Sequence, residues 1–146
     1  MGLLGNAAPA LADTSLVFQI AILVLLVVGW VVARNHRFGN HGILMVVAFA
    51  VHTIAIVAVM VPSLAASRGI FQQGLNTIAS VIGVHIVTGS LAEILGLYMV
   101  GRWMLNRLNL RPCLKKKTQM RLTLIVWVIA LIMGVYSYLL LYPPRL

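Results

Sequence analysis

The sequence predicts an all-α integral membrane protein that folds as an up-and-down four-helix bundle. Of its 146 residues, 62% are hydrophobic and only 9% are charged, and the mean hydropathy is +1.04. A soluble domain of this length has too little interior to bury so much apolar surface. The chain instead contains four apolar segments, each near the ~20 residues that a helix needs to cross a bilayer. These segments are 15–33, 42–61, 75–103 and 122–142.

Three of the four segments have features that affect their predicted structure or role. The first follows residues 1–15, which contain no Lys or Arg, and this stretch is predicted to be a short tail rather than a signal peptide. The second and third each carry a central histidine. The third is long for one crossing, so we expect it to tilt or to extend past the membrane at Arg102. No repeat or linker divides the chain, which predicts a single transmembrane domain, 1–146.

Basic residues in the connections predict the orientation. The first loop has Arg34 and Arg37, the second has only Arg68, the tail before the first segment has none, and the last tail has Arg145. The basic residues of the third loop are Arg107, Arg111, Lys115, Lys116, Lys117 and Arg121. Short loops rich in Lys and Arg remain in the cytoplasm, which predicts a multi-pass protein of the cytoplasmic membrane with both termini outside. The net charge of +9 then reflects topology and predicts no nucleic-acid partner.

Aromatic residues agree with this orientation. Trp30, Trp103 and Trp127 fall toward the predicted cytoplasmic ends of their segments, where interfacial aromatic residues are common. Three tyrosines gather at the opposite end of the last segment. They are Tyr136, Tyr138 and Tyr142.

The two central histidines, His52 and His85, form the main candidate site. If their segments are antiparallel helices, a rise of ~1.5 Å per residue brings both imidazoles to nearly the same depth. An ionisable side chain at that depth indicates a functional site. Two facing imidazoles predict a metal, most simply the iron of a haem b with both histidines as axial ligands. Cys113 is the only cysteine and no Cys-x-x-Cys-His motif occurs, so coordination and packing would hold the haem.

Small residues next to His85 fit either of two interpretations. Gly89 and Ala92 share its helix face and would leave room for a flat macrocycle. The same residues allow membrane helices to pack closely without a ligand, and they could support a homodimer. Each histidine alone could equally make an interhelical hydrogen bond.

Glu93 is predicted to be the one acidic residue inside a span, two turns beyond His85. An unpaired carboxylate would be costly there, so we expect it to be neutral or partnered. His41, at a similar level, is a candidate partner, either in proton handling or in a structural Glu–His contact, and a structural Glu–Ser contact is the alternative.

A basic rim next to the second segment offers partners for haem propionates. Arg34, Arg37 and His41 would bind them if the propionates point toward the cytoplasm. The candidates for the opposite orientation are Arg68, Gln72, Gln73 and Asn76. A metal clip formed by His36 and His41 is disfavoured, because a spacing of five does not stack two residues on one helix face.

Several motifs together resemble a known family. They are Arg34-Asn-His-Arg-Phe-Gly-Asn-His41, His85-Ile-Val-Thr-Gly, Val126-Trp127, Gly134-Val-Tyr and Leu141-Tyr142. In this order they resemble the short four-helix membrane proteins called domain of unknown function 420, from Gly29 to Tyr142. The chain also resembles small b-type membrane cytochromes.

The resemblance implies a respiratory-membrane setting, since some members of the family are associated with assembly of haem-copper terminal oxidases. The third loop of this chain lacks the histidine found in the family pattern, and His52 stands where that pattern commonly has an apolar residue. These two differences favour a haem inside the membrane.

Three functions therefore stand as hypotheses. The first is a monohaem b-type cytochrome with His52 and His85 as ligands, an electron-transfer protein rather than an enzyme, with a respiratory-chain or oxidase partner. The second is a non-catalytic assembly factor of a terminal oxidase that handles haem or a metal. The third is an intramembrane proton or ion pathway that uses Glu93 and the histidines.

Overall fold

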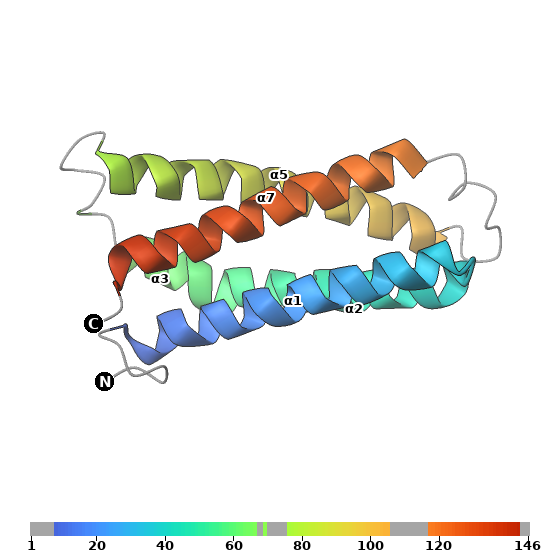
Figure 1. Cartoon of the computed structure of the whole chain (residues 1–146), viewed down its shortest axis with the longest axis horizontal. Helices are drawn as coiled ribbons and strands as arrows, with labels where there is room; N and C mark the ends of the chain where they lie inside the picture. The colour runs from blue at the N-terminus through green and yellow to red at the C-terminus, as the bar shows by residue number, and fades with distance from the viewer. Residues whose placement is uncertain (1–7, 67–68, 70–75, 106–116, 144–146) are drawn as a thin grey trace.

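The computed structural model describes residues 8–66, 69, 76–105 and 117–143, and they form four long helical spans (Figure 1). The spans are α1 (Ala10–Arg34), a second span that begins with α2 (Phe38–Ala55), α5 (Thr77–Leu105) and α7 (Lys117–Leu141). All four are long and apolar enough to cross a membrane, and the described residues contain no strand. The predicted all-α four-helix membrane bundle is confirmed, and the chain is a multi-pass membrane protein.

The second span changes its winding near its middle. After α2 it continues as a π-helical turn, η1 (Ile56–Met60), and then as α3 (Val61–Ala66). Pro62 has no N–H to donate to the carbonyl four residues earlier, and its ring would clash with that carbonyl in a regular α-helix. A wider turn before the proline relieves this clash, so Pro62 accounts for η1.

The helices pack as two antiparallel hairpins. The most extensive contacts join α5 with α7 and α1 with α2, and those between the two hairpins are fewer. Figure 1 shows the α1–α2 hairpin below the α5–α7 hairpin. The core lies between them and contains Ile22, Leu26, Ala48, Ala92, Trp127 and Leu131.

The two ends of the bundle differ in charge. We call the end where α1 begins and α7 ends, at the left in Figure 1, the terminal end. We call the opposite end the basic end, because Arg34, Arg37, Arg102 and Lys117 lie there. The other basic residues of the third predicted loop up to Lys116 lie outside the described residues.

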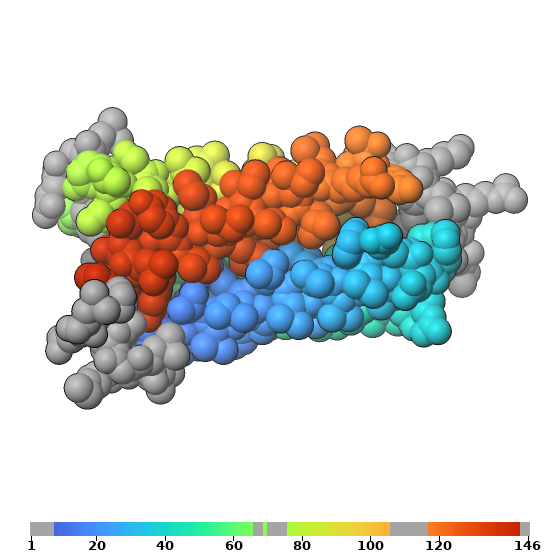
Figure 2. Space-filling view, viewed as in Figure 1, coloured from blue at the N-terminus to red at the C-terminus, as the bar shows by residue number. Residues whose placement is uncertain are grey.

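The outer surface is apolar along the length of the molecule. Large aliphatic side chains are exposed on every helix, and Val24, Ile54, Ile94 and Ile132 are more than half exposed. Figure 2 shows the helices as one elongated body. Surfaces of this kind face lipid, whose hydrocarbon replaces a protein interior.

Candidate functional site

Each hairpin is held internally by one histidine. In the α1–α2 hairpin, His41 Nδ1 donates to the carbonyl oxygen of Gly29 over 2.9 Å. In the α5–α7 hairpin, His85 Nδ1 donates to the carbonyl oxygen of Ala130, also over 2.9 Å. A carbonyl can only accept, so Nδ1 carries the proton in both rings, and Nε2 of a neutral ring is then an acceptor.

The two hairpins are joined by Glu93 of α5. Its Oε2 lies 2.8 Å from His52 Nδ1, and its Oε1 accepts a 2.6 Å hydrogen bond from the Thr53 hydroxyl. Both carboxyl oxygens therefore contact adjacent residues of α2. His52 is 4% exposed and the Glu93 side chain 22% exposed. This ionisable pair lies in the middle of the second span and of α5, where charge is expensive.

Trp127 of α7 packs against the same histidine. The indole and imidazole rings meet edge to face with 5.1 Å between their centroids, and Trp127 is 4% exposed. The prediction that Trp127 belongs to the membrane interface is wrong. Its ring fills the core between the hairpins, where it packs with Ile22, Leu26 and Leu131.

A second polar contact joins the hairpins near the terminal end. The Tyr138 hydroxyl donates to Asp13 Oδ1, and Asp13 is fully buried. Asp13 lies in the first turn of α1, where a carboxylate interacts favourably with the helix dipole. The expected tail to Ser15 and the expectation that Glu93 is the only acidic residue in a span are both corrected, since α1 begins at Ala10.

Three helices meet at Gly134 of α7. A Cβ added there would overlap Gln19 Oε1 of α1 and would lie 2.9 Å from His85 Cε1 of α5. Gln19 Oε1 is buried and has no hydrogen-bond partner, while its Nε2 lies 3.4 Å from Ser15 Oγ. Trp127 Nε1 is likewise buried without a partner. The hairpin interface thus contains unpaired polar atoms next to both central histidines.

The candidate pairing of Glu93 with His41 is wrong. Glu93 contacts His52, eleven residues beyond His41 and ~16 Å further along the second span. His41 instead uses Nδ1 within its own hairpin. The level of Glu93 relative to α2 depends on where the two hairpins meet, which sequence spacing does not specify.

The two central histidines do not face each other across an open gap. His52 contacts Glu93, which lies eight residues beyond His85, or ~12 Å along α5. The Trp127 indole covers one side of His52. A planar group bound to both imidazoles would therefore have to move this indole and separate the hairpins.

The remaining predicted site residues lie apart from this pair. Arg34 is exposed and its guanidinium lies 5.0 Å from the centre of the Trp30 ring. Arg37 precedes His52 by fifteen residues, ~22 Å along the second span. Ala92 is fully buried in the core, whereas a Cβ on Gly89 would meet nothing within 4 Å.

The other candidates are placed as follows. The Asn76 side chain accepts a hydrogen bond from the Ala79 N–H at the start of α5, so it acts as a helix cap. Arg68, Gln72 and Gln73 lie outside the described residues. His36 is exposed and packs against Phe38, away from His41. Among the described residues, no three His, Cys, Asp or Glu side chains are grouped closely enough to hold a metal ion.

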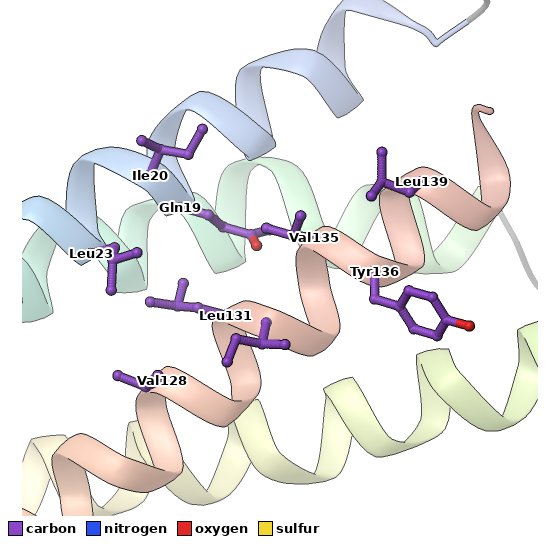
Figure 3. Close-up of a pocket in the computed structure, with 9 residues that line it drawn as sticks. Gln19, Ile20, Leu23, Val128, Leu131, Val135, Tyr136 and Leu139 are labelled. Carbon is purple, nitrogen blue, oxygen red and sulfur yellow. The ribbon is translucent and has the colours of Figure 1, made fainter. Parts of the chain in front are cut away.

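A groove of about 300 Å³ runs between α1 and α7 (Figure 3). Its lining is apolar except for Gln19 and Tyr136, and Leu131 and Val135 form part of its wall. Figure 3 shows the Gln19 side chain extending from α1 toward α7. The packing between α1 and α7 therefore leaves an open space here.

Sequence reasoning missed Asp13, Gln19, Thr53 and Tyr138 as members of the interface. Their signal is a polar side chain inside an apolar run, as for Gln19 between Phe18 and Ile20. No family model, curated protein or solved structure matches the chain.

Proposed function

We propose that the chain is a membrane protein that binds and releases a proton at the Glu93–His52 pair. The observation that carries this proposal is the 2.8 Å contact between the Glu93 carboxyl group and the His52 imidazole, inside four apolar spans. Carboxyl and imidazole groups in membrane interiors are typical of proton relays.

The contact geometry supports a simple proton transfer. The proton of a neutral Glu93 passes from Oε2 to His52 Nδ1, so that one O–H bond breaks and one N–H bond forms. The products are a carboxylate and an imidazolium, which can release its Nε2 proton to water. The Thr53 hydroxyl favours the carboxylate by donating to Oε1 over 2.6 Å.

Infrared spectroscopy can test this proposal, because the sequence contains only two acidic side chains, Asp13 and Glu93. The C=O stretch of a protonated carboxyl group is followed during pH titration of the purified protein in lipid. We expect a titrating band that is absent in Glu93→Gln and retained in the matched control Asp13→Asn. A Glu93 carboxyl that stays in one protonation state over the whole pH range of the folded protein contradicts the proposal.

We further propose that the basic end faces the cytoplasm and that the chain lies in the cytoplasmic membrane. The described basic residues at that end, with those of the third loop in the sequence, support this orientation. A periplasmic reporter enzyme fused after Leu146 should be active, and one inserted at residue 36 should be inactive.

Haem b binding is a second candidate function. It is favoured by the way both central histidines are held: Nδ1 contacts Glu93 in His52 and the Ala130 carbonyl in His85. Metal-binding histidines are commonly oriented by such a hydrogen bond to the second ring nitrogen. If the Trp127 indole moved and the hairpins separated, His52 and His85 would hold the iron through Nε2, and the haem would supply one-electron redox chemistry.

The optical spectrum separates the two candidates. If haem binds, purified protein expressed with ample haem should show a low-spin spectrum that is lost or becomes high-spin in both His52→Ala and His85→Ala. A colourless wild-type protein would eliminate the haem candidate and leave the proton proposal unaffected.

A further inference from the structure

We infer that the Glu93–His52 pair exchanges its proton only with the aqueous phase at the terminal end, along a path through His85 and Gln19. This inference rests on the proposed proton-binding function and adds the side from which the proton arrives. It follows from a difference between the part of the hairpin interface on the terminal side of the Glu93–His52 pair and the part on its basic side.

The terminal half of the interface is polar. From Glu93 the next ionisable group along α5 is His85, and across Gly134 from its ring lies Gln19 Oε1. The Gln19 amide nitrogen lies 3.4 Å from Ser15 Oγ, and Ser15 is half-buried one turn nearer the terminal end. Tyr138 hydrogen-bonds to Asp13 at this end.

Two buried polar atoms lie beside the two central histidines and lack hydrogen-bond partners. Gln19 is 7% exposed and its Oε1 has no donor, while Trp127 is 4% exposed and its Nε1 has no acceptor. A buried polar group left unpaired costs about 1–3 kcal/mol, and internal water normally satisfies it. Water that enters from the terminal end would satisfy both atoms and connect His52 with His85 and Gln19.

Gly134 lets the two polar side chains of this path approach the same point of α7. A Cβ at this position would overlap Gln19 Oε1 and would crowd His85 Cε1. The groove between α1 and α7 lies next to the same glutamine.

The basic half of the interface is closed by apolar packing. Three large side chains each pack directly on a glycine of a neighbouring helix. Phe49 on Gly96 and Trp103 on Gly42 lie between the hairpins, and Met45 on Gly29 lies within the α1–α2 hairpin. Phe49 carbon atoms lie 3.1 and 3.3 Å from the position of a Cβ on Gly96, which leaves no room for water between them.

Titratable groups are distributed in the same unequal way. The titratable side chains that are buried or half-buried among the described residues are Asp13, His41, His52, His85, Glu93, Tyr138 and Tyr142. Only His41 lies on the basic side of the Glu93–His52 pair, and its Nδ1 is engaged by the Gly29 carbonyl. The described residues thus provide a proton route to the terminal end alone.

Sided vesicles test the direction of exchange. The protein carries a C-terminal affinity tag, and phosphatidylcholine vesicles are separated into those with the tag outside and those with the tag inside. The external pH is then jumped while the Glu93 carboxyl band is recorded. We expect a fast response only in vesicles with the tag outside, and a slow response that follows the lumen pH in the others. An equally fast response in both populations overturns the inference.

Variants test the path. Gly134→Ala and Gln19→Leu should slow the fast response by about tenfold, a barrier increase of about 1.4 kcal/mol. Gly89→Ala is the matched control, because its new methyl group meets nothing within 4 Å. Gln19→Leu adds no bulk at the crowded glycine, so it tests the path even if Gly134→Ala fails to fold. If both folded variants respond as fast as wild type, the path is wrong although the proton-binding site stands. A Glu93 band that never titrates removes the proposed function itself.

Discussion

The Thr53 hydroxyl shows how one small group determines the state of the carboxyl group that it contacts. It lies 2.6 Å from Glu93 Oε1 and 3.0 Å from the carbonyl oxygen of Phe49. Its single proton can be donated fully to only one of these acceptors. Donation to Glu93 is preferred when the carboxyl group is charged, because charge-assisted hydrogen bonds are stronger.

Thr53→Val removes this donor and keeps the shape of the side chain. We expect it to lower the free energy of unfolding by roughly 0.5–2 kcal/mol, since one carboxyl oxygen loses its partner. The measurement is a denaturation titration in detergent micelles. Thr88→Val is the control, because that hydroxyl contacts only carbonyl oxygens of its own helix. Equal losses in the two variants would mean that the contact with Glu93 contributes nothing.

Tyr138→Phe tests the contact at the terminal end. Asp13 is fully buried and accepts a hydrogen bond from the Tyr138 hydroxyl. Loss of this hydroxyl should therefore destabilise the protein by about 1–3 kcal/mol. Tyr136→Phe, two residues away and 46% exposed, should change stability little. The same titration compares the two variants, and a larger effect at Tyr136 would contradict the assignment of the buried contact.

The sequence reveals which residues are candidates for the site, but it does not reveal which residues they contact. His52, His85 and Glu93 could be singled out because ionisable groups are rare in apolar runs. Their partners could not, because the sequence does not give the register between the hairpins, and His41 and His52 stand eleven residues apart on the second span. The prediction for Trp127 failed for a related reason. The depth of a residue along a helix does not determine whether its side chain faces lipid or the core.

At the scale of helices, glycines determine where α2 approaches its neighbours. Gly42 of α2 lies directly under the Trp103 indole of α5, so that any side chain there would overlap the ring. The number and approximate limits of the spans followed from hydropathy alone. The η1 turn did not follow from hydropathy, although Pro62 within an apolar run is the sequence feature that indicates it.

Gly42→Ala should therefore destabilise the protein by about 1–3 kcal/mol, the usual cost of overpacking. Gly39→Ala, in the first turn of the same helix, adds a methyl group that meets nothing within 4 Å and should be neutral or slightly stabilising. Thermal unfolding of both variants, followed by circular dichroism, checks the difference. A neutral Gly42→Ala would show that Trp103 does not pack on this glycine.

At the scale of the whole molecule, two hairpins with internal histidine–carbonyl bonds are joined through side-chain contacts of Glu93 and Asp13. Apolar side chains could join them at least as well, since replacing a buried ion pair by hydrophobic residues is often neutral or stabilising. A pair that served only to join the hairpins would therefore be dispensable. A pair that binds a proton would not.

A double-mutant comparison separates these roles. His52→Leu alone leaves the Glu93 carboxyl group without its imidazole partner and should cost about 3–5 kcal/mol of unfolding free energy. Adding Glu93→Met should restore most of that loss, because neither residue then places a polar group in the core. The double variant should be folded, since its hairpins still pack through Ile22, Leu26 and Leu131, yet it should lack the titrating carboxyl band. If Glu93→Met restores no stability, the two side chains are not energetically coupled. The hairpins would then be joined mainly by apolar packing, and Glu93 and His52 would act independently.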